Sequence, residues 1–373
     1  MKRLLPLILL SAPLASIGAD LQTGSGEIDG YRLVWQDLFD DGTLNPQRWN
    51  IEVNGDGGGN AELQYYTDSE NNVRVGDDGN GNGCLIITAR RENYRNKNFT
   101  SGRVTSQNRT TFTHGKLEAA IKLPKTANGL WPAFWMMGND ISSVGWPRCG
   151  ETDIVEMGNV NGIRRGTSDR YFNGACHWGT NWDAVGDYAR DHTWDYSLQD
   201  DEFHLYTCIW DQNLISMYLD MDKYPNRDPY YVIDISRVDP SDGWCAGNYF
   251  HKENFILFNL AVGGNFPQIW DAGGITALND GNGQQASMYV NYVKIYQKGD
   301  SSEFFQSMIP GDKQPEETGT NVISMVENPG VEVFNLGGLR VAKAESAGDL
   351  NGKLSPGIYI VKEGSKTSKI VVK

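Results

Sequence analysis

Short β-forming runs, separated by Gly, Asn and Asp, fill the chain from residue 31 to residue 297. In residues 116–123 and 289–296, apolar and polar side chains alternate with a period of two, as in half-buried antiparallel strands. Residues 204–210 form another such β-rich run. No window of about 11 residues carries a convincing helical period of 3.6. The pattern therefore predicts one large all-β domain, either a sandwich or a barrel.

The composition changes after Gln297. Residues 299–319 are rich in Asp, Ser, Glu, Pro and Gly, and this composition predicts a linker. It separates the β domain, residues 20–298, from a tail, residues 320–373. The tail is long enough for a compact β module, because it holds four short alternating runs, 331–335, 339–341, 357–361 and 369–372.

The first residues have the form of an export signal. Lys2 and Arg3 precede an apolar run, residues 4–10, which is followed by small residues. This order predicts a secretory signal peptide over residues 1–19, and hence a protein that is secreted or held at the outer cell surface. No other stretch approaches the roughly 18 apolar residues that a membrane-spanning helix needs.

The chain is acidic, with a formal net charge of −14 at pH 7. Such a charge repels nucleic acid and anionic membranes, so neither is expected as a partner. It suits a neutral polymer better than a sulfated one. The chain is expected to act as a monomer.

The five cysteines are an odd number for an exported chain, so at most two bridges can form. Their spacing contains no Cys-x-x-Cys unit, which argues against zinc. Most of them are expected to be small buried hydrophobic residues. They are Cys84, Cys149, Cys176, Cys208 and Cys245.

Three carboxylates fall within six residues: Glu151, Asp153 and Glu156. Val, Ile and Thr between them favour a strand, in which Glu151 and Asp153 share a face and Glu156 points away. A β-bulge between Asp153 and Glu156 would return Glu156 to that face. The two glutamates could then approach to about 5–6 Å, close to the roughly 5–5.5 Å of a retaining glycoside hydrolase.

Two alternatives to catalysis stay open for this acidic segment. It could be a solvated strand face, although three like charges on one face are destabilising and no Lys or Arg lies between Glu151 and Met157. It could also bind a divalent cation, because carboxylate oxygens suit calcium or magnesium.

Aromatic residues lie just upstream. In a strand over residues 130–138, Trp131, Ala133, Trp135 and Met137 share one face. Two indoles on one side make a flat apolar wall of the kind that binds the C–H faces of sugar rings. The alternative is a tryptophan-rich core. Next to the paired carboxylates, the cleft is favoured for both tryptophans.

Further polar candidates are scattered along the chain. Asn60 and Glu62 follow a run of three glycines, Arg103 lies in a Ser-Gly-Arg segment, and His177 precedes Trp178. His177 could bind a hydroxyl or steady a nucleophile, and a purely structural role is the alternative.

Together these segments resemble glycoside hydrolase family 16, in its laminarinase-like branch. The resemblance covers about 260 residues. It implies a β-jelly-roll sandwich of two curved antiparallel sheets with a concave glycan groove. The matching text includes VWQDLFDDGTLNPQRW, NAELQYYT, SGRVTSQNRTTFTHGKLEAAIKLP, GLWPAFWMMG, GWPRCGETDIVEMGN and NLAVGGNFP.

The resemblance implies Glu151 as nucleophile and Glu156 as general acid/base, with Asp153 between them and hydrogen-bonded to the nucleophile. It implies a secreted endo-β-glucanase that cuts β-1,3-glucan or mixed-linkage β-1,3-1,4-glucan with retention. The β-glucan polysaccharide is then the partner of the groove. The positions that line the groove in relatives correspond here to Asn60, Glu62, Arg103, Trp131, Trp135 and His177.

The chain departs from the family pattern at positions linked to calcium. Relatives usually have a glutamate where this chain has Leu38 and an aspartate where it has Asn291. The loss of a charged ligand weakens the expectation of a structural calcium. No cofactor is expected to be required. A branched aliphatic residue is usual at Thr152, which would face away from the acids.

The tail resembles the C-terminal sorting domain of the type IX secretion system, in VEVFNLGGLRVAKAE, LSPGIYIVKEG and SKIVVK. This resemblance implies type IX secretion machinery as a partner. The alternative is a small carbohydrate-binding module, which the absence of tryptophan from residues 320–373 disfavours.

Two rival functions remain. A galactan-type hydrolase, acting on agar, porphyran or carrageenan, shares the bulged acidic signature. A non-catalytic glucan-binding protein could use the same sandwich, but binding alone does not need a crowded acid triplet.

Overall fold

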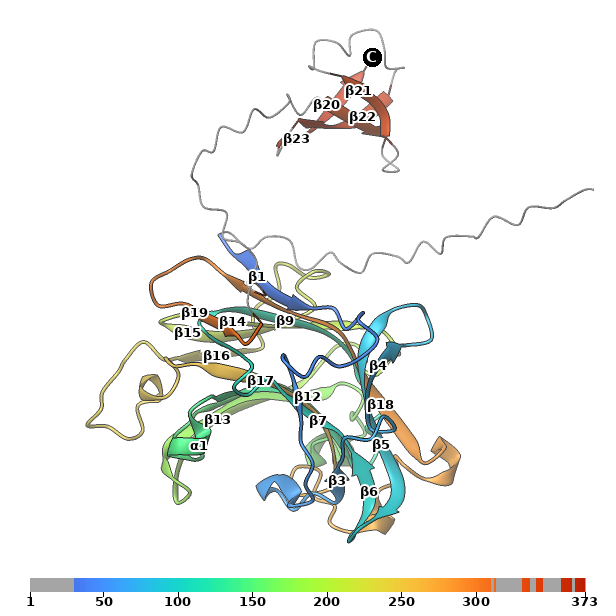
Figure 1. Ribbon diagram of the computed structural model, residues 1–373, viewed down its shortest axis with the longest axis vertical. Helices are drawn as coiled ribbons and strands as arrows, with labels where there is room; N and C mark the ends of the chain where they lie inside the picture. Colours follow the sequence, from blue (N-terminus) through green and yellow to red (C-terminus); the bar gives the residue numbers. More distant parts are fainter. Residues whose placement is uncertain are drawn as a thin grey trace, which may run out of the picture. The chain divides into compact units, whose positions relative to one another are not determined.

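The computed structural model describes residues 30–309, 312, 331–335, 340–344, 357–363 and 366–372. The predicted signal peptide lies outside these residues. The chain divides into two compact units, one ending at Pro315 and the other beginning at Glu316. Figure 1 shows the first unit as two stacked layers of strands, with β1, β9 and β14 in one layer and β12, β13 and β17 in the other.

The first layer is a sheet of ten strands, in the order β16-β15-β14-β9-β18-β5-β6-β3, with β1 beside β18 and β4 beside β5. All pairs are antiparallel except β3 with β6. The strands are β1 (Arg32–Asp37), β3 (Gln64–Tyr66), β4 (Val73–Asp77), β5 (Gly83–Tyr94), β6 (Lys97–Ser101), β9 (Gly115–Lys122), β14 (His204–Trp210), β15 (Leu214–Leu219), β16 (Tyr231–Asp234) and β18 (Gln285–Gln297).

The second layer is a sheet of nine strands, in the order β13-β12-β11-β10-β17-β7-β2, with β8 beside β17 and β19 beside β8. The strands are β2 (Asn50–Ile51), β7 (Arg103–Thr105), β8 (Thr110–Thr113), β10 (Leu130–Gly138), β11 (Glu151–Met157), β12 (Tyr171–Asn181), β13 (Ala184–Thr193), β17 (Asn254–Val262) and β19 (Phe304–Ser307).

The described part of this unit contains only short helices, as the lack of a helical period predicts. Two are α-helices, α1 (Ile141–Val144) and α2 (Val160–Arg165), and four are 3₁₀ turns, η1 (Gly57–Gly59), η2 (Ala246–Asn248), η3 (Ala272–Gly274) and η4 (Asp280–Asn282). None of the helices in the described residues is long and apolar enough to cross a membrane.

The core lies between the two sheets and is rich in aromatic rings. Phe134 of β10 and Phe258 of β17 stack with ring centroids 4.9 Å apart. β10 pairs with β17 along its whole length, and all nine residues of each strand are buried. The inner face of β10 packs in the core. Its outer face is also shielded from solvent, and it forms the floor of a cavity described below.

Two expectations from the sequence need correction. The polar side of β9 was expected to face water, but Lys116 and Glu118 are buried. They form a 3.2 Å ion pair, and the ring of Tyr296 lies 4.0 Å from Lys116 Nζ. The predicted linker 299–319 also starts too early, because β19 (Phe304–Ser307) pairs with β8. The sandwich therefore continues through Ser307.

The second unit contains a four-stranded antiparallel sheet in the order β21-β20-β22-β23. Its strands are β20 (Val331–Asn335), β21 (Arg340–Ala344), β22 (Gly357–Glu363) and β23 (Lys366–Val372). They coincide with the four runs that the sequence predicts as strands.

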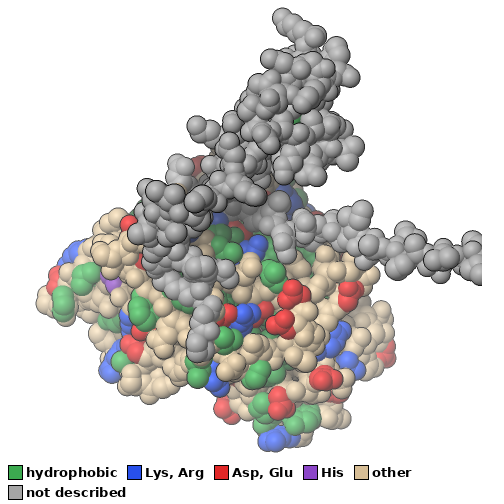
Figure 2. Space-filling model, turned by 45° about the horizontal axis from the view of Figure 1, so that its top comes forward, with side chains coloured by type: hydrophobic (Ala, Val, Ile, Leu, Met, Phe, Trp, Pro, Cys, Tyr) green, Lys and Arg blue, Asp and Glu red, His purple; other side chains and the backbone are tan. Residues whose placement is uncertain are grey.

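All five cysteines are free and buried, so they serve as small hydrophobic residues. On the face of the first unit drawn in Figure 2, basic side chains are scattered singly among acidic and uncharged ones. That face carries no continuous basic surface.

Candidate active site

The acidic strand β11 contains the predicted bulge. Its register with both neighbouring strands shifts between Asp153 and Glu156, so one residue of β11 is extra. The side chains of Ile154 and Val155 are buried in the core. The shift turns Glu156 to the side that already carries Glu151 and Asp153. A regular strand would have sent it inward.

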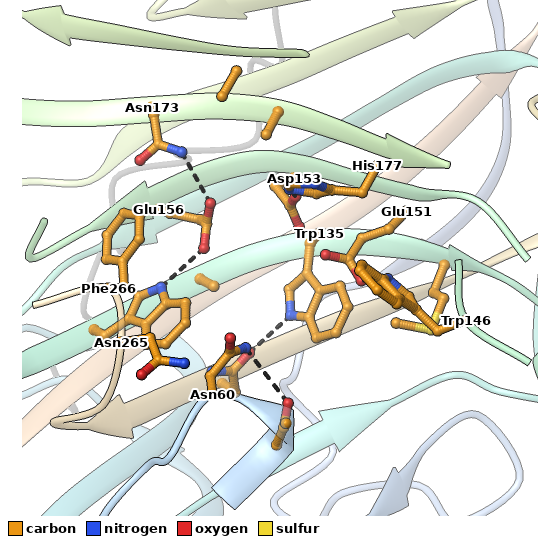
Figure 3. A pocket seen from close by; sticks show the side chains of 18 of the residues that line it. Asn60, Trp135, Trp146, Glu151, Asp153, Glu156, Asn173, His177, Asn265 and Phe266 are labelled. Carbon is orange, nitrogen blue, oxygen red and sulfur yellow. Dashed lines mark hydrogen bonds and ion pairs between the residues drawn. The ribbon is translucent and has the colours of Figure 1, made fainter. Parts of the chain in front are cut away.

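A cavity of about 870 Å³ lies on the outer face of the nine-stranded sheet, and we call it the groove. The structure brings all nine residues that the sequence singles out into its lining. Figure 3 shows Glu151 and Glu156 from β11 in the same pocket, with Trp135 between them in this view. The nine are Asn60, Glu62, Arg103, Trp131, Trp135, Glu151, Asp153, Glu156 and His177.

Glu156 is held by two donors. Trp131 Nε1 donates to Oε1 at 2.9 Å, and Asn173 Nδ2 donates to Oε2 at 3.0 Å. Burial raises the pKa of Glu156 to about 7, since a charged carboxylate is poorly solvated there. The carboxyl can therefore hold a proton near neutral pH, which suits a general acid.

Glu151 has a different partner. Trp146 Nε1 donates to its Oε2 at 3.0 Å, and the Trp146 ring lies 4.3 Å from that of Trp182. Burial, and then the charge of Asp153, raises the pKa of Glu151. The positive charges of His177 and Arg103 and the indole hydrogen bond oppose that rise and favour the ionised form.

Asp153 is paired with His177 and not with Glu151. His177 Nε2 lies 3.3 Å from Asp153 Oδ2. Among the described residues, no hydrogen bond joins Asp153 to Glu151, which corrects the expectation from the resemblance. The three side chains are nevertheless close, because one polar atom from each of Glu151, Asp153 and His177 lies within 4.8 Å of the other two. Burial opposes a charge on His177, but Asp153 and Glu151 outweigh it and raise the pKa of the ring to about 10.

The pKa of Asp153 is also raised, first by burial and then by the charge of Glu156. Like charges that lie close together raise the pKa of a carboxyl. Burial is the larger cause for all three carboxyls. The cationic His177 then offsets part of the negative charge that remains.

The two tryptophans of β10 form the floor of the groove and are also largely buried. Trp131 stacks on Phe266, with ring centroids 4.7 Å apart and planes at 14°. Trp135 Nε1 donates to Asn259 Oδ1 at 2.8 Å, and the guanidinium of Arg103 lies 4.8 Å from the Trp135 ring centroid. The cleft and the core interpretations are thus both partly right.

A glycine-rich turn places the remaining predicted residues. Glu62 accepts hydrogen bonds from Gln64 Nε2 and, at 2.9 Å, from Tyr66 OH. A Cβ at Gly58 would lie 2.4 Å from Glu62 Oε1, and Gly58 has a φ of +58°. A side chain here would displace the Glu62 carboxyl and strain the backbone, so glycine lets the turn η1 pack directly over Glu62 beside Asn60.

The lining also contains residues that sequence reasoning missed. Trp146 and Asn173, which hold the two glutamates, were not singled out, although Trp146 stands in the segment GWPRCGETDIVEMGN. Asn173 lies in β12 with no local signal, because only strand pairing brings it to Glu156. Other missed lining residues are Asn159, Trp182, Asp187 and Asp191, whereas Asn259, Asn265 and Phe266 lie in the segment NLAVGGNFP, which the sequence already offered.

Neither of the two positions that the resemblance links to calcium carries a carboxylate. Leu38 packs against a cluster of Ala120, Leu205 and Tyr292. Asn291 Nδ2 donates to Gly83 O at 2.8 Å. In this arrangement the amide and the carbonyl bind each other and do not jointly coordinate a cation.

Comparison with known proteins agrees with this geometry. The sequence profile described as Glycosyl hydrolases family 16 matches residues 61–235. A Glucan endo-1,3-beta-glucosidase of Cryptopygus antarcticus is 38% identical over 245 residues, which cover 63% of this chain and 81% of that protein. The Glucan endo-1,3-beta-glucosidase A1 of Niallia circulans is 32% identical over 290 residues, which cover 73% of this chain and 38% of that protein. The chain thus spans well under half the length of this longer relative.

Solved structures confirm the jelly-roll sandwich. A Bacteroides ovatus mixed linkage glucan GH16 protein, in complex with a G4G4G3G product, has a TM-score of 0.61 and 39% identity, covering 70% of this chain and 99% of that one. The catalytic domain of an endo-1,3-beta-glucanase (laminarinase) from Thermotoga petrophila has a TM-score of 0.58 and 30% identity, covering 73% and 100%.

Proposed function

The chain belongs to glycoside hydrolase family 16, and from this premise we propose that it is an endo-β-glucanase. Its proposed substrates are β-1,3-glucan of the laminarin type and mixed-linkage β-1,3-1,4-glucan. One observation carries the proposal. Glu151 and Glu156 project from one bulged strand into one groove, and each carboxyl is held by a different indole.

The two carboxyls support a double displacement. Glu156 gives its proton to the glycosidic oxygen as the bond to the anomeric carbon breaks, and Glu151 attacks that carbon to form a glycosyl-enzyme ester. Glu156, now a carboxylate, takes a proton from water. The water oxygen displaces Glu151, and the product keeps the β configuration.

The charge of the groove favours a neutral glucan over a sulfated galactan. Its lining has six carboxyl side chains but only one arginine and one histidine. Arg103 Nε is already paired with Glu52 Oε1 at 3.1 Å, and His177 with Asp153. A sulfate group would meet net negative charge, whereas sugar hydroxyls can donate to carboxylates.

A non-catalytic glucan-binding role fits the site less well. Burial of three neighbouring carboxyls is costly, and their raised pKa values express that cost. A binding groove could satisfy sugar hydroxyls with neutral amides instead. The retained acids therefore support catalysis.

The test is release of reducing sugar from laminarin and barley glucan, with agarose and carrageenan as controls. We expect cleavage of at least one glucan, β-anomeric first products by proton NMR, and loss of activity in Glu151→Gln and Glu156→Gln. Binding without cleavage by the unmodified protein would establish the binding role. Cleavage of carrageenan or agarose alone would establish the galactan role.

We also propose that the protein is exported and sorted through its tail, and that it acts as a monomer without a required cofactor. The signal-like residues 1–19 and the tail text support export through type IX machinery. Removal of residues 320–373 should leave the protein inside the outer membrane of a type IX-competent host. Equal surface or medium levels of both forms would disprove the sorting role.

A further inference from the structure

A second cavity, of about 380 Å³, lies beside β13 and next to the groove. We call it the Trp244 cavity. It lies between β13, at the edge of one sheet, and β16, at the edge of the other, beneath the loop 236–247. Figure 1 shows this gold-coloured loop projecting from the sandwich near the labels β16 and β13. Its aromatic lining residues are Trp178, Tyr188 and Trp244.

Trp244 is 58% exposed. Three of the chain's 11 tryptophans are more than half exposed, and the other two are Trp182 and Trp270. Trp182 lines the groove, and Trp270 Nε1 donates to Asn265, which also lines it. Trp244 is therefore the one strongly exposed indole that neither lines the groove nor donates to a residue that lines it. Exposure of so large an apolar side chain is typical of a binding surface.

The loop that presents Trp244 is fixed before any ligand arrives. The backbone carbonyl of Trp244 accepts from Trp178 Nε1 at 3.0 Å, and its backbone N–H donates to Asp242 Oδ1 at 3.0 Å. Asn248 Nδ2 donates to the carbonyl oxygens of Asp239 and Asp242 at 2.7 and 2.9 Å. A loop backbone held in this way loses little conformational entropy on binding.

The charges around the ring suit an uncharged ligand rich in hydroxyl groups. Arg237 is the one cationic residue in the lining, and its guanidinium is paired with Asp239 at 2.6 Å and with Asp242 at 3.1 Å. Asp187 and Asp234 add carboxylates that can accept from hydroxyl groups. An anionic ligand would be repelled, whereas a sugar could stack on the indole and donate to the carboxylates.

The Trp244 cavity adjoins the groove, because Asp187 lines both. We propose that it is a second glucan-binding site, which holds a neutral β-glucan segment beyond the part of the chain that lies in the groove. This inference rests on the proposed function, since the groove supplies the polymer. The site would raise affinity for long chains without taking part in bond cleavage.

The test uses the full chain and the glucan that the enzyme cuts. Affinity electrophoresis in native gels measures the Kd for that polymer in a Glu151→Gln background, with and without Trp244→Ala. We expect Trp244→Ala to weaken polymer binding about threefold to tenfold. Trp244→Phe should retain most of the binding, because it keeps a flat ring. Val238→Ala is the matched control, since Val238 is 57% exposed in the same loop but does not line the cavity.

Activity separates this site from the groove. With Glu151 intact, Trp244→Ala should leave kcat/KM for a β-glucan tetrasaccharide unchanged and raise KM for the polymer. An unchanged Kd for the polymer in Trp244→Ala would overturn the inference, and so would an equal loss of kcat/KM on tetrasaccharide and polymer. Neither result would contradict the proposed hydrolase activity. If the unmodified protein binds a glucan but cuts none, the proposed hydrolase function is disproved. Weaker glucan binding by Trp244→Ala would still support the second site in that case.

Discussion

The indole of Trp146 donates a 3.0 Å hydrogen bond to Glu151, so a residue five positions upstream holds the proposed nucleophile. A strand alone could not fix the carboxylate in this way, because its long side chain has several rotamers. The contact also favours the ionised carboxylate that must attack the anomeric carbon. Trp146 is thus a positioning residue.

Replacement of Trp146 by Phe tests this role. The ring remains, but the donor is lost, and a hydrogen bond to a charged group contributes about 1.5–3 kcal/mol. We expect kcat/KM to fall about 10- to 100-fold, with a smaller effect on KM. Trp182→Phe is the control, since it keeps an aromatic neighbour for Trp146 and removes no bond to Glu151. Equal activity of Trp146→Phe and unmodified protein would disprove the role.

The pH dependence of activity should report Glu156. Its pKa is raised to about 7, and it must be protonated to act as general acid, so kcat/KM should fall as the pH rises through about 7. Asn173 donates to Glu156 and thereby lowers this pKa. Asn173→Ala should move the alkaline limb of the profile to higher pH. A limb that stays in place or moves down would contradict the assignment of the proton.

Glu156→Gln should lose activity but raise the free energy of unfolding at alkaline pH. The folded-state pKa of Glu156 is raised above the ordinary 4.5, so the folded protein holds this proton more tightly than the unfolded chain does. Its contribution to the free energy of unfolding therefore falls as the pH rises from about 4.5 to about 7. An uncharged amide avoids this loss. The free energy of unfolding of the variant should therefore exceed that of the unmodified protein by about 1–3 kcal/mol at pH 8 and by little at pH 4.

Urea unfolding at both pH values measures that gain. Asn173 can rotate its amide so that Oδ1, which lacks a partner in the structure, accepts from the new amide. The same rotation turns Asn173 Nδ2 to the position where Oδ1 has no partner now, a cost that does not depend on pH. A gain that is the same at pH 4 and pH 8 would show that the ionisation of Glu156 is not its cause.

Metal removal should have no effect. Leu38 offers no ligand, and the Asn291 amide is occupied with Gly83 O. We expect EDTA to leave both the Tm and the rate of glucan cleavage unchanged. As a matched comparison, Leu38→Glu combined with Asn291→Asp restores the acidic residues usual in relatives and should make the Tm depend on calcium. A Tm that falls in EDTA and recovers with calcium in the unmodified protein would contradict this prediction.

Local sequence patterns were enough to predict the fold class and to select the side chains that we propose to react. A period of two excludes helices, and the spacing of Glu151, Asp153 and Glu156 requires a bulge if all three are to share a face. These features are local, because side-chain direction within one strand depends only on neighbouring residues. The three acids of β11 share one face for this local reason, and the six other residues chosen with the help of the resemblance lie in the same groove.

The partners of those side chains depend on how the whole chain packs. Asn173 reaches Glu156 through the register of β12 on β11, and Phe266 reaches Trp131 from a loop more than 100 residues downstream. The Trp244 cavity needs edges of two different sheets. Sequence periodicity reports the face of a strand but not the register or neighbours of that strand. Burial, which sets the pKa of the acids, likewise depends on every segment packed around them.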